Sequence, residues 1–223
     1  MMAVFFDIDD TLLDHEAAAR AGAAALHRSL AAAAPVEQFV AAWAAALDRN
    51  FPRYLAGELT FQGQRRERIR EVVDGGLTDE AADSVFAGYQ QAYEAAWTLF
   101  PDVLPCLDAL SHGRVGIISN GQVEQQHQKL VHTGIAARFA CIVISEGCGC
   151  SKPSPEIFLE ACRQVGASPR DAVYVGDRYD IDAVGARQAG LTGVWLDRRR
   201  TRTALEQDPV IGTLDELAGV LRR

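Results

Sequence analysis

The sequence contains no long apolar run and has few features of an exported protein. None of its 223 residues falls in a stretch approaching the roughly 18 apolar residues of a membrane-spanning helix. The apolar residues 1–6 end at Asp7 and are too few for a secretory signal. The five cysteines are an odd number, and Cys148 and Cys150 lack the two-residue gap of a zinc or thioredoxin motif. We therefore expect a cytoplasmic protein with reduced thiols and no membrane partner.

Positive charge is also scarce. The chain has 22 lysine and arginine residues against 30 aspartate and glutamate residues, which gives a formal net charge of −8. Its one basic run is Arg198–Arg202, so we expect no nucleic-acid partner, because binding to a phosphate backbone depends on many basic contacts. An acidic protein also repels anions. A phosphate-binding site in this chain would therefore need a local reversal of charge.

Five short runs rich in β-branched and aromatic residues predict strands that are buried on both faces of a parallel sheet. They are residues 3–6, 115–118, 141–144, 172–175 and 193–196. Helical patterns separate the last four runs, at residues 122–132, 155–165 and 181–189, and a glycine follows each of them. Strands that alternate with helices predict an α/β fold with a Rossmann-like parallel sheet.

The segment between the first two strands breaks this alternation. Residues 15–100 are rich in alanine, contain no convincing strand, and predict an inserted all-α domain. The candidate helices are residues 16–33, 37–50, 62–74 and 79–96. Four arginines between positions 65 and 70 alternate with glutamates, which predicts solvent-facing ion pairs on the third of these helices. Residues 1–14 and 101–223 then form the core domain.

Four polar segments follow the predicted strands. They are FFDIDDTLLD at residues 5–14, IISNG at 117–121, SKPSPEIF at 151–158, and VYVGDRYDIDAVGA at 173–186. In open α/β sheets, ligands bind at the carboxyl ends of the strands. We therefore expect the acids, the hydroxyl, the amide and the lysine of these segments to surround one crevice.

Together these segments resemble the haloacid dehalogenase-like (HAD) superfamily of hydrolases, and the resemblance covers nearly the whole chain. The matching residues are Asp7-Ile8-Asp9-Asp10-Thr11, then Ser119, then Lys152, and finally Gly176-Asp177 with Asp182. The inserted helices look like the cap domain that closes over the active site in this superfamily. The resemblance therefore implies an enzyme with a Rossmann-like core and an α-helical cap.

The resemblance also implies roles for the acidic residues. Asp7 would be the nucleophile, because a carboxylate that attacks phosphorus forms an aspartyl-phosphate and divides the hydrolysis into two easier steps. Asp9 would be the general acid and base. Asp7, Asp177 and the backbone carbonyl of Asp9 would bind Mg²⁺, which prefers oxygen ligands. Asp182 would lie behind them and orient either Lys152 or a water molecule on the metal.

The remaining matches imply a phosphate-binding site. Ser119, Asn120 and neighbouring N–H groups would hold the phosphate, with Asn120 acting through its backbone or its side chain. Lys152 would neutralise the charge on the nucleophile and on the phosphate oxygens. Asp10 stands where many members of the superfamily have glycine, and we attach no substrate preference to it.

We therefore predict a Mg²⁺-dependent phosphomonoester hydrolase. Its substrate would be a small phosphorylated metabolite, such as a sugar phosphate or a nucleoside monophosphate, and the protein would be a monomer or homodimer. A 2-haloacid dehalogenase is an alternative, but dehalogenases of the superfamily have tyrosine where this chain has Asp9. A phosphomutase and a non-catalytic phospho-ligand-binding protein are further alternatives. A receiver-type signalling domain is disfavoured by the helical insertion and by Asp9.

Overall fold

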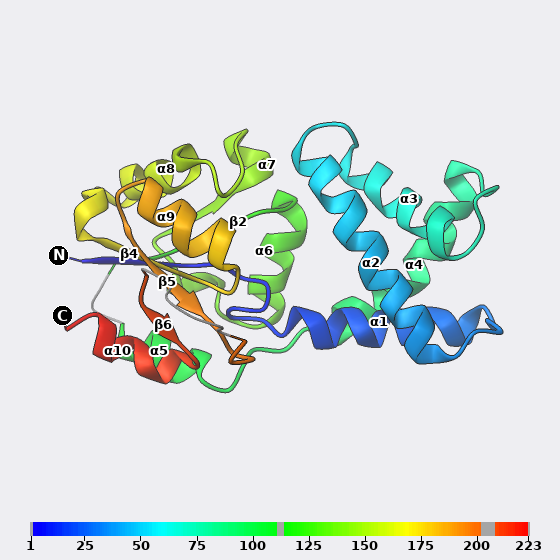
Figure 1. The fold of residues 1–223 in the computed structure, drawn as a ribbon, viewed down its shortest axis with the longest axis horizontal. Helices are drawn as coiled ribbons and strands as arrows, with labels where there is room; N and C mark the ends of the chain where they lie inside the picture. The colour runs from blue at the N-terminus through cyan, green and yellow to red at the C-terminus, as the bar shows by residue number, and fades with distance from the viewer. Residues whose placement is uncertain (1, 111–113, 202–207, 223) are drawn as a thin grey trace. The chain divides into compact units, whose positions relative to one another are not determined.

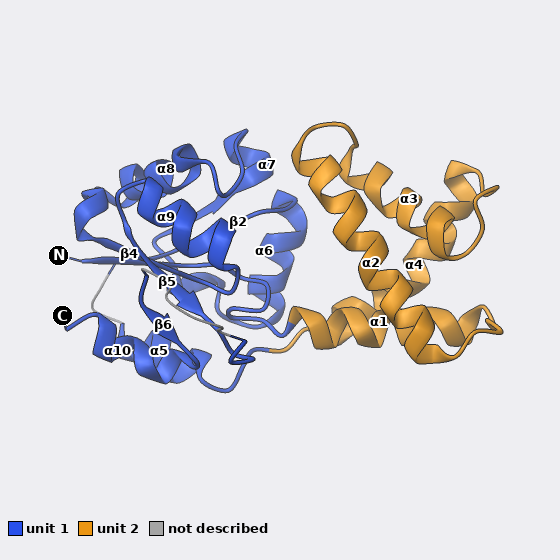
Figure 2. Cartoon of the chain, in the orientation of Figure 1, with its two compact units in different colours: residues 1–14, 99–223 blue, residues 15–98 orange. Residues whose placement is uncertain are grey.

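The structure is a computed structural model that describes residues 2–110, 114–201 and 208–222. The chain divides into two compact units (Figure 2). Unit 1 comprises Met1–Asp14 and Leu99–Arg223, and unit 2 comprises His15–Thr98. The sequence predicted the second boundary two residues later, after residue 100.

Unit 1 is built on a six-stranded parallel sheet in the order β3-β2-β1-β4-β5-β6 (Figure 1). The strands are β1 Ala3–Phe6, β2 Arg114–Ser119, β3 Cys141–Ile144, β4 Ala172–Gly176, β5 Thr192–Leu196 and β6 Val210–Ile211. Every neighbouring pair in this order is parallel. The predicted fold class, an α/β fold with a Rossmann-like parallel sheet, is therefore confirmed. The sixth strand was not predicted.

Helices cover both faces of this sheet. They are α5 Val103–Ala109, α6 Val123–His132, α7 Ser145–Cys148, α8 Pro155–Val165, the π-helical turn η3 Tyr179–Ala183, α9 Val184–Gln188 and α10 Leu217–Val220. Three 3₁₀ turns complete the unit, η1 Ala136–Arg138, η2 Pro169–Asp171 and η4 Leu214–Glu216. Figure 1 shows α8 and α9 on one side of the sheet and α5 and α10 on the other. Local chemistry sets the helix ends, since α8 starts at Pro155 and is closed by Gly166 at φ 62°.

The strand register brings the polar segments to one edge of the sheet. Phe6, the last residue of β1, pairs with Ile117 of β2 and with Val175 of β4. Asp7 and the residues after Ile117 and Val175 therefore emerge side by side at the carboxyl end. This is the edge at which parallel sheets bind ligands.

Unit 2 consists of four helices, α1 His15–Ser29, α2 Val36–Leu55, α3 Phe61–Val72 and α4 Asp79–Ala95. Thr60 and Thr78 begin α3 and α4 as N-caps, and their side chains accept hydrogen bonds from Gly63 N and Ala81 N. Buried aromatic side chains fill the interior. They are Phe39, Trp43, Phe86, Tyr89, Tyr93 and Trp97.

The arginines of α3 have two different environments. Arg66 and Arg70 form the expected ion pairs, Arg66 with Asp79 and Asp83, and Arg70 with Asp79 and Glu67. The expectation of a solvent-facing side chain is wrong for a third arginine of the helix, which is buried. The alternating charges indicated pairing but could not show which member of the series faces the interior.

Arg68 is that buried arginine. It is only 4% exposed, and its guanidinium carbon lies 4.3 Å from the centre of the Trp43 ring. The charge is therefore placed among aromatic rings, where a cation–π contact offsets part of the cost of desolvation. Within residues 2–110, 114–201 and 208–222, no helix is both long enough and apolar enough to span a membrane.

Candidate active site

Asp7 lies at the carboxyl end of β1 and is 7% exposed. Its backbone N–H donates to the carbonyl of Val175 at 3.0 Å, so the pairing of β1 with β4 continues one residue further and fixes the position of Asp7. Lys152 Nζ lies 2.9 Å from Asp7 Oδ1. This contact lacks hydrogen-bond geometry, so among the described residues the buried Asp7 Oδ1 has no hydrogen-bond donor.

Lys152 reaches Asp7 from the loop before α8 and is held on several sides. Its Nζ donates to Asp182 Oδ1 at 2.8 Å and to the hydroxyl of Tyr174 at 2.7 Å. Burial alone would lower the pKa of Lys152, but the carboxylates of Asp182 and Asp7 outweigh it and raise the pKa above its usual value. The ammonium group is therefore a permanent positive charge beside Asp7.

Asn120 fixes the backbone at Lys152. Its side-chain Nδ2 donates to the carbonyl of Lys152 at 3.0 Å, and its Oδ1 accepts from the N–H of Lys152 at 2.8 Å. Both ends of the Asn120 amide are thus engaged in placing the lysine. The role of Asn120 as a phosphate ligand, through its backbone or its side chain, stays a prediction.

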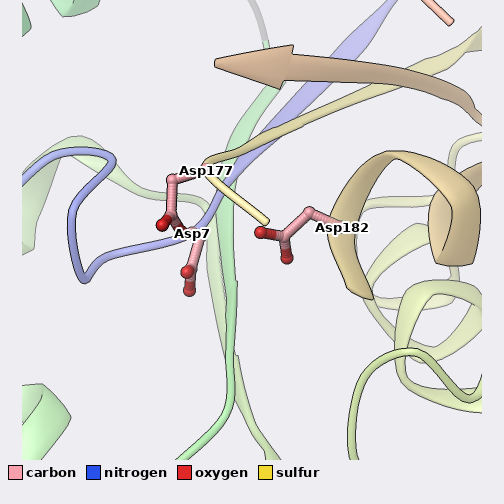
Figure 3. A group of neighbouring side chains, drawn as sticks. All are labelled: Asp7, Asp177 and Asp182. Carbon is pink, nitrogen blue, oxygen red and sulfur yellow. The ribbon is translucent and has the colours of Figure 1, made fainter. Parts of the chain in front are cut away.

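Three carboxyl groups converge beside Lys152. Asp7, Asp177 and Asp182 each offer an oxygen atom, and these atoms lie within 4.8 Å of one another. Figure 3 shows the three side chains turned toward one another from β1, from the end of β4 and from η3. Burial raises the pKa of Asp7 to about 6 and that of Asp177 to about 8, and the neighbouring carboxylates add to both shifts. Lys152 lowers both pKa values but does not cancel the rise, so without a metal ion these groups hold protons more tightly than ordinary aspartates.

This carboxylate cluster suits a hard divalent cation. Asp182 is already engaged, because Oδ1 accepts from Lys152 and Oδ2 accepts from the Arg178 N–H at 2.9 Å. In Asp7, by contrast, Oδ1 is contacted by the Lys152 ammonium at 2.9 Å without hydrogen-bond geometry, and Asp177 is crowded by negative charge. Oxygen ligands of this kind are typical of Mg²⁺. The residues present therefore fit a metal ion held by Asp7 and Asp177, with Asp182 behind them.

Asp9 points toward α6. Lys129 Nζ donates to both carboxylate oxygens of Asp9 at 2.7 Å. Gln126, one turn earlier on the same helix, contributes its Nε2, which lies 3.1 Å from Asp9 Oδ2 and 2.9 Å from Ser119 Oγ. The hydroxyl of Ser119 is buried at the end of β2. The structure therefore brings Ser119 and Asp9 together through one side chain of α6.

Lys129 and Gln126 were not among the residues predicted for this site. The available signal was their spacing, because positions 126 and 129 lie on the same side of α6 as the apolar residues Val123 and Leu130. Both are 2% exposed. A lysine on the buried side of a helix requires a partner of opposite charge. That requirement points to an acid, but the sequence does not say which one.

Comparisons with known proteins establish the family. Residues 1–190 match the family model described as haloacid dehalogenase-like hydrolase. The chain therefore belongs to the haloacid dehalogenase-like hydrolases, as the motifs indicated, and it is an enzyme of that family.

Two named phosphatases are similar to this chain over most of its length. The chain is 32% identical to glyceraldehyde 3-phosphate phosphatase from Methanothermobacter thermautotrophicus, over 94% of this chain and 91% of that enzyme. It is also 32% identical to phosphoserine phosphatase from Thermus thermophilus, over 89% of each chain. Among solved structures, the HAD hydrolase YfnB from Bacillus subtilis shares the fold with a TM-score of 0.81 at 21% identity, over 100% of this chain and 99% of that one.

Proposed function

We propose that this protein is a Mg²⁺-dependent phosphomonoester hydrolase that acts through an aspartyl-phosphate on Asp7. The observation that carries the proposal is the buried contact of Asp7 with Lys152 and with the acids Asp177 and Asp182. This arrangement supplies a carboxylate nucleophile, a fixed positive charge and a candidate cation site within one cluster. Relatives that are 32% identical over most of the chain are named as phosphatases, which supports the same reaction.

The first half of the proposed reaction uses two aspartates. A carboxylate oxygen of Asp7 attacks phosphorus, and the bond between phosphorus and the ester oxygen breaks. Asp9 donates a proton to the departing oxygen, so that the product leaves as an alcohol. Lys152 stabilises the negative charge on the reacting oxygens, while Ser119 and neighbouring backbone N–H groups bind the phosphoryl group.

The second half returns the enzyme to its starting state. Asp9 now removes a proton from a water molecule as that water attacks the phosphorus of the aspartyl-phosphate. The bond to Asp7 breaks and inorganic phosphate is released. Asp7, Asp177 and the carbonyl of Asp9 would hold a magnesium ion, and its chemistry would be to supply positive charge against the phosphoryl oxygens.

The substrate class that we propose is a small phosphorylated metabolite. The two relatives named above are phosphatases of glyceraldehyde 3-phosphate and phosphoserine, and both of these compounds are short phosphate esters. Sugar phosphates and nucleoside monophosphates also belong to this class of small phosphorylated metabolites. Asp9 favours phosphate ester hydrolysis over dehalogenation, because a halide leaving group needs no proton whereas an alkoxide does.

Phosphate release from a panel of such metabolites tests the proposal. Wild-type enzyme should release phosphate in Mg²⁺ and lose that activity in excess chelator. Asp7→Asn should lower turnover by at least about 10³-fold, because the nucleophile is removed. Asp171→Asn makes the same change of charge at an exposed position in η2 and should leave turnover unchanged. Near-normal turnover by Asp7→Asn would show that Asp7 is not the nucleophile.

A further inference from the structure

We propose that Lys129 is a positioning residue for the acid and base of the reaction, and that it holds the Asp9 carboxylate in one orientation relative to the phosphate-binding Ser119. The inference rests on the proposed function, because it requires that Asp9 transfer protons. The role of Lys129 concerns the direction in which the Asp9 carboxylate points. Neither the family motifs nor the sequence analysis assigned a role to Lys129.

The contact between Lys129 and Asp9 fixes both oxygens of one carboxylate. Nζ lies 2.7 Å from Oδ1 and 2.7 Å from Oδ2, so rotation of the carboxylate in either direction lengthens one of the two bonds. The lysine side chain is only 2% exposed, whereas that of Asp9 is 27% exposed. The buried lysine therefore holds an acid whose side chain is still partly accessible to solvent.

Gln126 ties the same carboxylate to the predicted phosphate site. Its Nε2 lies 3.1 Å from Asp9 Oδ2, 2.9 Å from Ser119 Oγ and 3.2 Å from the carbonyl of Asn120. One amide group thus links the residue that would transfer protons to two residues that would hold the phosphate. Lys129 and Gln126 are three positions apart on α6, so a single helix face sets the spacing of the site.

The chemistry of Asp9 remains possible in this arrangement. A carboxylate has about four lone-pair sites, so contacts from one ammonium and one amide do not exhaust its capacity to carry a proton. The reaction needs that proton to point at the departing oxygen in the first step and at water in the second. A carboxylate free to rotate would meet that requirement for only part of the time, which lowers turnover without weakening substrate binding.

A purely structural ion pair is the alternative to this interpretation. Lys129 would then join α6 to the loop after β1, and its loss would loosen the site for all substrates alike. A positioning role predicts a selective effect, because only substrates with a poor leaving group need the proton from Asp9. The two possibilities therefore differ in how the loss depends on the substrate.

The experiment compares four enzymes on two substrates in saturating Mg²⁺. The enzymes are wild type, Asp9→Asn, Lys129→Met and the double variant, and the substrates are p-nitrophenyl phosphate and glycerol 2-phosphate. Lys129→Met should lower kcat for glycerol 2-phosphate by about 10–100-fold, which is part of what a general acid contributes. KM should change less than about threefold, and kcat for p-nitrophenyl phosphate should fall far less. Gln128→Met, at an exposed position of the same helix, is the matched control and should behave as wild type.

The double variant separates positioning from structure. If Lys129 acts through Asp9, adding Lys129→Met to Asp9→Asn should cause no further loss of kcat, because the group that it positions is already disabled. Lys129→Arg keeps a charged donor that can contact both oxygens, so it should recover part of the lost kcat. If Lys129→Met does not fold, Lys129→Gln replaces it in every comparison.

The outcomes also distinguish the two proposals. Equal losses on both substrates for Asp9→Asn would overturn the proton-transfer role of Asp9 and, with it, this inference. A selective loss for Asp9→Asn, combined with an unselective loss for Lys129→Met, would overturn the positioning role and leave the proposed function standing. An additive loss of kcat in the double variant would likewise overturn the positioning role of Lys129 and leave the proposed function standing.

Discussion

At the scale of single residues, Arg198 connects parts of unit 1 that are far apart in the sequence. Its two terminal nitrogens donate to the carboxylate of Asp102 at 2.7 and 2.9 Å, and one of them also donates to the carbonyl of Thr11 at 2.8 Å. The guanidinium carbon lies 3.9 Å from the centre of the Phe100 ring. Arg198 therefore fastens the loop after β5 to the two segments through which the chain leaves and re-enters unit 1.

Arg198→Met should lower the free energy of unfolding by about 3–5 kcal/mol, because it leaves the buried Asp102 carboxylate without its partner. Urea denaturation of the full chain at pH 7 measures this loss of stability. Burial alone would raise the pKa of Asp102, but hydrogen bonds from Arg198 and from the Leu214 N–H hold it below the usual value. A depressed pKa stabilises the fold above the unfolded value of about 3.9 and ceases to do so as the pH falls through the folded value.

The difference between wild type and Arg198→Met should consequently shrink below about pH 4, where Asp102 of the unfolded chain becomes protonated. Arg170→Met changes an exposed arginine of η2 and should cost less than about 0.5 kcal/mol. A difference between wild type and Arg198→Met that stays constant as the pH is lowered would argue that packing of the arginine side chain, and not the ion pair, carries the stabilisation.

The candidate site shows which residue-scale features a sequence can predict. Asp7 and Asp177 directly follow strands and Ser119 ends one, and the parallel register alone gathers them at one edge of the sheet. Lys129 comes from within a helix, and its partner Asp9 lies 120 positions away in the chain. Spacing along α6 predicts which face is buried but not what that face meets, so this pairing needed the three-dimensional structure.

At the scale of secondary-structure elements, the five long strands of unit 1 were predictable because each is an apolar run between polar segments. β6 was missed because two residues are too few to show a periodic pattern. The second helix of unit 2 was expected to end at residue 50, yet α2 continues through Pro52 to Leu55. A proline in the last turn removes only one hydrogen bond, and the packing of the rest of the helix outweighs that loss.

The packing of η3 against the sheet depends on glycine in two strands. A Cβ at Gly193 of β5 would lie 2.1 Å from the carbonyl oxygen of Ala183. A Cβ at Gly176 of β4 would lie 2.3 Å from Cγ of Asp182. Neither glycine has a positive φ, so the requirement is one of space. The two glycines allow η3 to approach closely enough for Asp182 to reach Lys152 at 2.8 Å.

Gly193→Ala should therefore lower the free energy of unfolding by about 2–3 kcal/mol, because the added methyl group meets a backbone oxygen that cannot turn aside. Gly219→Ala is the matched control, since the same methyl group enters open space on the exposed side of α10. That control should be neutral or stabilising by about 0.5–1 kcal/mol, because glycine is unfavourable within a helix. Denaturant unfolding of both variants checks the prediction. Equal changes in the free energy of unfolding for the two variants would refute it.

At the scale of the whole molecule, the net charge of −8 by itself disfavours a phosphate substrate. The structure shows how part of this acid is used, because three aspartates of the cluster face a single lysine. A negative cluster of this kind attracts a divalent cation, and the bound cation then reverses the local sign of the charge. The charge of the chain thus predicts a metal requirement for substrate binding, although it says nothing about the fold.

The same cluster makes stability depend jointly on pH and Mg²⁺. In the metal-free protein the pKa of Asp7 is raised to about 6 and that of Asp177 to about 8, against about 3.9 in an unfolded chain. The folded state therefore binds protons more tightly than the unfolded state. These two groups stabilise the metal-free fold at low pH, and that contribution is lost as the pH rises from about 4 to about 8.

Magnesium competes with these protons, so its stabilising effect should increase with pH. We expect the increase in Tm caused by saturating Mg²⁺ to be at least about 4 °C larger at pH 8 than at pH 5.5, which corresponds to about 1–2 kcal/mol in a chain of this size. Thermal unfolding with Mg²⁺ or with chelator at the two pH values measures it. Asp177→Asn should remove most of the Mg²⁺ effect, whereas Asp171→Asn should retain it. An equal Mg²⁺ effect at both pH values would show that the cation binds elsewhere, because a site built from these two carboxyl groups must release protons when the metal enters.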